Sequence, residues 1–124
     1  MRSTACFSPV PASVTAARHW VRDVLEPNNP DALVLDAELC VSELAANAVG
    51  HARTEFQVEV SEDDGVVRVS VHDENHGPVM PRTAPTFDAT GRGLSIVDAV
   101  ARWWGVIDDP PTGKTVWFVL GGKA

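Results

Sequence analysis

The chain has 124 residues, of which 44 % are hydrophobic and 22 % charged, and its formal net charge at pH 7 is −7. This length is typical of one domain that buries a core of its own, so we expect residues 1–124 to form a single domain. The acidic charge argues against a nucleic-acid-binding protein, which needs a cationic surface, and no stretch approaches the ~18 consecutive apolar residues of a membrane span.

The two cysteines, Cys6 and Cys40, are too few for a disulfide framework or a four-ligand zinc site. The N-terminus lacks the apolar segment of a signal peptide. We therefore expect reduced thiols and a cytoplasmic location.

The first half of the chain predicts two helices after a short strand. Residues 1–10 contain an apolar run with prolines that is compatible with an edge strand. Ser13 can cap a helix over roughly 12–26. The inner face of that helix would carry Val14, Ala17, Val21, Val24 and Leu25. After a loop rich in proline and asparagine, a second helix begins near Asp31 and runs to about His51.

A hairpin follows the second helix. Apolar and polar residues alternate over 55–60, which predicts a half-buried strand. The turn sequence Asp63-Asp64-Gly65 is a hairpin signal, and Val67, Val69 and Val71 alternate on the returning strand.

The last third predicts a loop, a helix and a second hairpin. Residues 74–90 show no periodicity, and a loop of that length in a compact domain is usually a lid or a binding loop. A third amphipathic helix extends to about Trp104, and closing strands follow near 104–108 and 114–120. This order predicts an α+β two-layer sandwich with three helices on one face of a mixed, mainly antiparallel sheet.

One line of polar residues interrupts the apolar second helix. Glu43, Asn47 and His51 recur at intervals of four, so they share one helix face. Burying an acid and an amide without partners is costly, so such a line needs either a structural partner or a ligand. For this line alone, a structural or solvated stripe is the commoner explanation.

Two further groups of residues lie at the end of a predicted strand and at the start of a predicted helix. Asp73 ends the returning strand of the hairpin and can accept a hydrogen bond from an exocyclic amine, while Gly77 lets a flat ring approach the backbone. Gly91-Arg92-Gly93-Leu94 opens the third helix, where bare N–H groups and the helix dipole favour phosphate. Each motif alone is weak evidence, but the three in this order indicate a nucleotide site.

These motifs resemble the GHKL (Bergerat-fold) ATP-binding superfamily, and within it the small anti-sigma-factor serine-protein kinases of bacteria. Residues 42–52 are similar to the N box, 73–77 to the G1 box and 91–94 to the G2 box, with an ATP lid at 78–90 between them. Thr115 matches the threonine of the family's closing strand. The resemblance covers nearly the whole chain and implies the Bergerat type of two-layer sandwich.

The resemblance also implies roles for single residues toward ATP. Asn47 would ligate a Mg²⁺ ion that bridges the phosphates, and Glu43 would be the general base for the attacking hydroxyl. Asp73 would bind the adenine amino group, with Thr115 helping through water. The phosphate cradle would be the G2 box, with backbone N–H groups of Gly91 and Gly93 beside Leu94 and a γ-phosphate contact from Arg92.

The resemblance leaves two functions open. The first is an ATP-dependent serine/threonine kinase that sequesters a sigma factor, phosphorylates a STAS-domain antagonist and forms homodimers. The second is a module of the same fold that binds nucleotide or a partner and transfers no phosphoryl group. The second is motivated by a short lid and by Asn75, which stands where the G1 box usually has its first glycine.

Overall fold

The structure, a computed structural model, describes residues 1–74, 95–109 and 113–122. The second of these ranges begins with a helical segment over 95–100. The other elements, in chain order, are β1 (Arg2–Phe7), α1 (Ala12–Leu25), the 3₁₀ turn η1 (Glu26–Asn28), α2 (Asp31–Asn47), the π-helical turn η2 (Ala48–Ala52), β2 (Phe56–Asp63), β3 (Val66–Asp73), β4 (Trp103–Asp109) and β5 (Gly113–Gly121).

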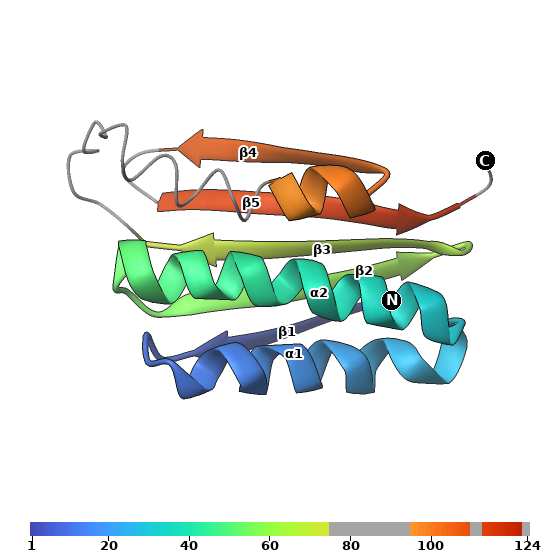
Figure 1. The fold of residues 1–124 in the computed structure, drawn as a ribbon, viewed down its shortest axis with the longest axis horizontal. Coiled ribbons are helices and arrows are strands. Elements are labelled where there is room, and N and C mark those ends of the chain that lie inside the picture. The colour runs from blue at the N-terminus through green and yellow to red at the C-terminus, as the bar shows by residue number, and fades with distance from the viewer. Residues whose placement is uncertain (75–94, 110–112, 123–124) are drawn as a thin grey trace.

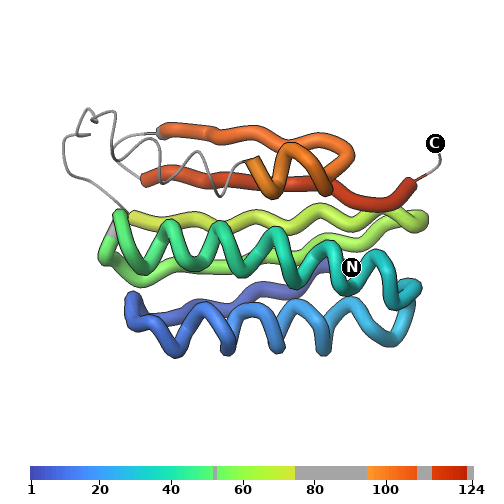
Figure 2. Tube along the Cα trace, in the orientation of Figure 1, coloured from blue at the N-terminus to red at the C-terminus, as the bar shows by residue number. Residues whose placement is uncertain are grey.

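The helices and the strands form two layers, as the sequence predicts. α1, α2 and the segment 95–100 all lie on one face of a five-stranded sheet (Figure 1). The strand order is β1-β2-β3-β5-β4, so β1 and β4 are the edges (Figure 2). This confirms the α+β two-layer sandwich.

The sheet differs from the prediction in one respect. We expected a mixed sheet, but every neighbouring pair among the described strands is antiparallel. For the central pair the reason is the local connection: β2 and β3 form a two-residue hairpin, and a short connection of that kind can only join antiparallel strands. Asp64 and Gly65 of this turn have φ values of 57° and 79°, which is the left-handed geometry of a type I′ turn.

The core lies between the helices and the inner face of the sheet. Strand alternation sends every second side chain inward, and these inner side chains are apolar almost throughout. The inner face buries Phe56, Val58 and Val60 of β2, Val67, Val69 and Val71 of β3, and Phe118 and Leu120 of β5. The predicted inner residues Ala17, Val21 and Leu25 of α1 are fully buried against it.

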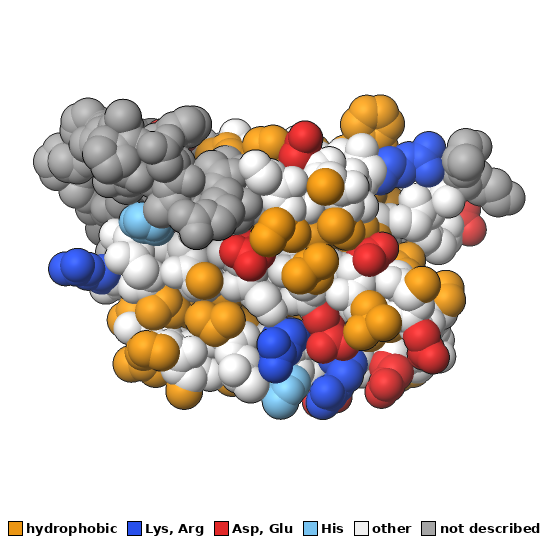
Figure 3. Space-filling view, in the orientation of Figure 1, with side chains coloured by type: hydrophobic (Ala, Val, Ile, Leu, Met, Phe, Trp, Pro, Cys, Tyr) orange, Lys and Arg blue, Asp and Glu red, His pale blue; other side chains and the backbone are white. Residues whose placement is uncertain are grey.

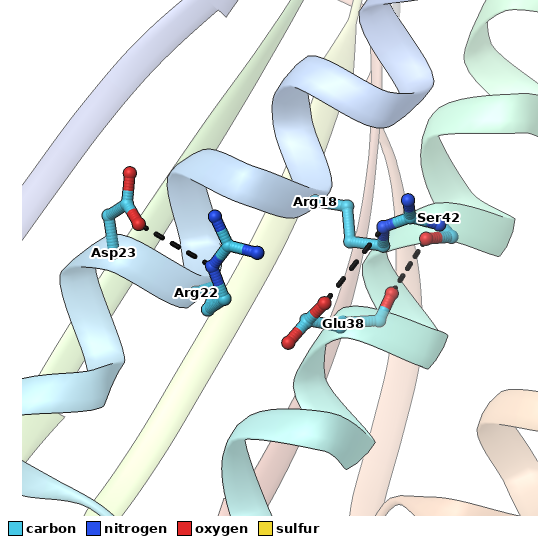
Figure 4. A network of polar contacts seen from close by, with 5 residues as sticks. All are labelled: Arg18, Arg22, Asp23, Glu38 and Ser42. Carbon is cyan, nitrogen blue, oxygen red and sulfur yellow. Dashed lines mark hydrogen bonds and ion pairs between the residues drawn. The ribbon is translucent and has the colours of Figure 1, made fainter. Parts of the chain in front are cut away.

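The ion pairs of the helical layer are peripheral to this core. Arg18 Nε of α1 lies 3.9 Å from Glu38 Oε1 of α2, and Ser42 Oγ donates to the Glu38 carbonyl at 2.7 Å (Figure 4). A second pair joins Arg22 and Asp23 within α1. Charged side chains gather over the helices in Figure 3, with hydrophobic side chains between them. Exposed pairs contribute at most about 1 kcal/mol each, so apolar burial holds α1 and α2 together.

The predicted helix starts and ends need two corrections. Ser13 does not cap α1: the N-cap is Pro11, which has helical dihedrals, and Ser13 is buried within the first turn. α1 still begins at Ala12, as predicted, because the fixed φ of a proline suits the start of a helix.

The third helix ends earlier than predicted. We expected it to reach Trp104, but the described helix covers 95–100 and β4 begins at Trp103. Aromatic and β-branched residues favour a strand here. The Trp104 indole bonds back to the helix, donating to Asp98 Oδ1 at 2.7 Å.

No helix within the described residues is long and apolar enough to cross a membrane. This agrees with the absence of a long apolar run in the sequence.

The buried face of α2 makes a prediction about thiol chemistry. Burial, with smaller contributions from the charges of Asp36 and Glu43, raises the pKa of the Cys40 thiol to about 12, whereas Cys6 is exposed. Because the thiolate is the reactive form, the folded protein at pH 8 should react with Ellman's reagent at Cys6 alone. In denaturant both thiols should react, and Cys6→Ser should leave no fast-reacting thiol. Rapid reaction of both thiols in the folded protein would contradict this burial.

The same pKa predicts a pH dependence of stability. The unfolded chain releases the Cys40 proton near its ordinary pKa of 9.0, well below the folded value of about 12. The free energy of unfolding should therefore decline as the pH rises from 9 toward 12, and Cys40→Ala should remove this part of the decline.

Candidate functional site

The end of the second helix is the first component of the site. After Asn47, α2 continues as the π-helical turn η2, which closes with Arg53 in the left-handed conformation. The Arg53 N–H donates to the Ala48 carbonyl at 3.0 Å, a wider loop than the α-helical one. π-helical turns are rare and frequently occur at functional sites. This turn changes the path of the chain while keeping Asn47 and His51 on the same pocket.

The end of β3 is the second component. Asp73 follows Val67, Val69 and Val71 on the inner face of the strand and is only 4 % exposed. It is the one buried acidic or basic side chain among the described residues. The next residue anchors this strand end, because the Glu74 N–H donates to Thr54 Oγ1 at 3.1 Å, just after η2. The carboxylate of Asp73 is thus held next to the end of the second helix.

A pocket of about 140 Å³ opens between these components. Among the described residues, its walls are the apolar side chains of α2 and the inner sheet face, and its polar groups come from four residues. The lining residues are Leu44, Asn47, Ala48, His51, Val71, Asp73, Val106, Lys114 and Val116. An apolar cavity of about 150 Å³ accepts benzene, so a pocket of this size with one open side suits part of a flat heterocycle. Apolar walls with a few placed polar groups are typical of ligand sites.

The start of β5 completes the pocket. Gly113 has a φ of 121°, and a Cβ atom there would overlap the Asp73 carbonyl oxygen. Glycine is therefore required for β5 to approach β3 so closely. This approach places Lys114 directly opposite Asp73 in the strand register, and both residues line the pocket.

The structure does not bring Thr115 to this pocket. Its hydroxyl lies 2.8 Å from His72 Nδ1, and both residues belong to the face of the sheet that points away from the helices. The reason is strand alternation: Val116, Phe118 and Leu120 point inward, so Thr115 points outward and Lys114 inward. Sequence reasoning missed Lys114, although the same alternation could have identified it.

The remaining predicted residues separate into two groups. Glu43 lies one helical turn before Asn47, half buried, and is not a lining residue of the pocket. Gly77, Gly91, Arg92, Gly93 and Leu94, with the expected lid at 78–90, lie outside the described residues. Their roles stay predictions. The structure thus brings together Asn47, His51 and Asp73, and adds Lys114.

A two-layer domain with such a pocket at the end of its second helix is a candidate nucleotide-binding domain. Over residues 7–120 the chain matches the model of the family described as the histidine kinase-like ATPase domain. The chain therefore belongs to this family. The match confirms the GHKL-type ATP-binding domain that the motifs indicated. A comparison with curated proteins gives no match.

The size and lining of the pocket are compatible with part of the base of ATP. A purine ring can lie between apolar walls, and a carboxylate at the inner end of the pocket can accept hydrogen bonds from an exocyclic amino group. Within the described residues no cluster of three or more His, Cys, Asp or Glu could hold a metal ion. A metal that shares its ligands with phosphate oxygens needs only one or two protein groups, which Asn47 can begin to supply.

The buried carboxylate makes a direct prediction. Asp73→Asn keeps the size of the side chain but replaces one acceptor oxygen by a donor group, so it should weaken Mg-ATP binding by about ten-fold or more. Calorimetric titration measures the loss. The matched control is Asp63→Asn, at the opposite, exposed end of the same β-hairpin, which should bind like the parent protein. Equal affinity in the Asp73 variant and the parent would remove Asp73 from the site.

Proposed function

We propose that the protein is an ATP-dependent serine/threonine kinase that acts as an anti-sigma factor in the bacterial cytoplasm. The observation that carries the proposal is the meeting of Asn47, at the end of α2, with Asp73, at the end of β3, on one pocket of a histidine kinase-like ATPase domain. These residues are the N-box asparagine and the G1-box aspartate of the resemblance. The serine-kinase subgroup is supported by the motif sequences alone.

Each residue has a physical task in this proposal. Asp73 orients the base, and Asn47 supplies an amide oxygen for Mg²⁺ near the pocket rim. The bound metal would neutralise phosphate charge during transfer. Glu43, one helical turn earlier, would take the proton from the serine hydroxyl of the substrate protein as that oxygen bonds to the γ-phosphorus and the bond from this phosphorus to the departing ADP breaks.

The proposed partners are a sigma factor, a STAS-domain antagonist and a second copy of the chain. Large apolar side chains exposed on the surface support a protein that binds other proteins. Trp103 and Ile107 of the edge strand β4 are 62 % and 48 % exposed, and Leu35 of α2 is 63 % exposed.

A binding-only module is the second candidate, favoured by one observation. Glu43 does not line the pocket, so it stands apart from the group that would hold the base. Such a module would bind Mg-ATP and a partner without transferring phosphate.

One substitution separates the two functions. Glu43→Ala should reduce ³²P transfer from Mg-ATP to a STAS-domain antagonist of the same host by about 100-fold or more, because a general base contributes roughly that factor. Its calorimetric affinity for Mg-ATP should stay unchanged. The control is Asp36→Ala, an exposed carboxylate on the same helix, which should label the antagonist like the parent protein.

The outcomes are distinct. Undiminished transfer by Glu43→Ala would exclude Glu43 as the base. Tight ATP binding by the parent protein without transfer to any antagonist of the host would favour the binding-only module.

A further inference from the structure

The strand β4 is an edge of the sheet. It pairs with β5 on one side, and no described strand pairs with its other side (Figure 1). An edge strand presents a row of backbone N–H and C=O groups, which natural proteins usually protect by a charge, a proline or a bulge. The run from Trp103 to Ile107 contains no charged residue and no proline. The backbone of this edge can therefore pair with another strand.

The side chains of β4 make this edge apolar on both faces of the sheet. Alternation along the strand sends Trp103 and Ile107 to the outer face, where they are 62 % and 48 % exposed. Val106 belongs to the inner face and is also exposed. The opposite edge strand, β1, begins instead with an exposed cation, since Arg2 forms an ion pair with Glu59 of β2. Pairing at β4 would therefore bury large apolar side chains.

A second copy of β4 matches this edge in one register. Two identical antiparallel strands are related by a twofold axis, and residues directly opposite each other lie on the same face. When Gly105 lies opposite its own copy, Trp103 comes opposite Ile107 of the second copy. On the other face, Trp104 comes opposite Val106 of the second copy. Both pairs join an aromatic and a β-branched side chain, a combination that stabilises antiparallel sheets.

The two neighbouring registers lose this match. A register with Val106 on the twofold axis brings Trp104 opposite Asp108. A register with Trp104 on the axis brings Trp103 opposite Gly105, which has no side chain to contact. The apolar pairs therefore select the register that is centred on Gly105.

Charge favours the same register. Arg102, the residue before β4, comes opposite Asp108 of the second copy, and both residues are exposed. Opposite charges that face each other across an antiparallel pair stabilise it, and the twofold axis repeats this pair. Two chains that each carry a net charge of −7 repel each other, so they need such a complementary place to meet.

We propose that two copies of the chain associate through antiparallel pairing of β4, with Gly105 at the twofold axis, to form one continuous sheet. This inference rests on the homodimer proposed above and names the surface that forms it. Because Val106 also lines the nucleotide pocket, the interface would lie beside that site.

Two other uses of this surface have different consequences. An extended segment of another protein could add to the same edge, and the chain alone would then be a monomer. Two copies could instead pack face to face through the outer side of the sheet. That packing would bury Ile107 together with Val66 of β3, which is exposed on the same face. Edge pairing buries Ile107 and leaves Val66 in solvent.

Sedimentation velocity of the parent protein and two lysine variants distinguishes these cases. The parent protein should sediment as a dimer. Ile107→Lys should raise the dissociation constant of the dimer by about 100-fold or more, because the substitution acts twice and places a charge against Trp103. Val66→Lys, the matched control on the same face, should remain a dimer. Both variants should bind Mg-ATP like the parent protein in calorimetric titrations.

Cysteine cross-linking tests the register. Trp103→Cys and Ile107→Cys would be made separately in a Cys6→Ser background, since Cys6 is the exposed thiol. Directly opposite residues have Cα atoms about 5 Å apart, within the range of a disulfide. Oxidation of a mixture of the two variants should give a covalent dimer. Either variant alone should not, because the two copies of one position would lie about 14 Å apart.

Four outcomes would overturn the assignment. They are a monomeric parent protein, an Ile107→Lys variant that stays dimeric, loss of the dimer in Val66→Lys, and cross-linking of a single variant as strong as that of the mixture. The nucleotide site is tested separately, since it fails only if the parent protein does not bind Mg-ATP in the same titrations. The failure of this interface and the failure of the proposed nucleotide site are therefore distinguishable.

Discussion

The buried carboxylate of Asp73 is the constraint on which the site depends. It continues a row of inward-facing valines on β3, where a charge is costly unless polar groups surround it. Three features surround this strand end. Gly113 lets β5 approach β3 closely, and Lys114 lies opposite Asp73 in the strand register. The Glu74 N–H donates to Thr54 Oγ1 just after η2. The buried carboxylate at the end of a row of valines is therefore the feature from which the proposed nucleotide site starts.

The net negative charge of the chain limits how it can bind a negatively charged nucleotide. The chain carries a net charge of −7, yet its family binds a polyphosphate. An acidic protein can hold an anion only through local groups, such as backbone N–H donors, a bound cation or a placed lysine. In the described part of the chain, Lys114 is a lysine that lines the pocket. The expected phosphate-binding residues of the G2 box lie outside that part.

Much of the fold follows from residue patterns, because its signals are local. The valines of β3 and the turn at Asp64-Gly65 predict the central hairpin from alternation and backbone preference alone. The order of the motifs predicts that Asn47 and Asp73 belong to one nucleotide site, and both residues line the same pocket. The π-helical turn was not predictable, since the same residues also fit a regular α-helix. Thr115 was assigned by motif similarity, whereas the face of a strand residue depends on register, which the close approach at Gly113 decides.

The central claim is that adenine binds in the pocket between α2, β3 and β5. A crystal structure of the protein with Mg²⁺ and a non-hydrolysable ATP analogue tests it most directly. The account predicts the base between Leu44, Val71 and Val116, its amino group on Asp73, and the Asn47 amide oxygen on the metal. A base bound on the outer face of the sheet beside His72 and Thr115, or a pocket left empty by a bound nucleotide, would contradict it.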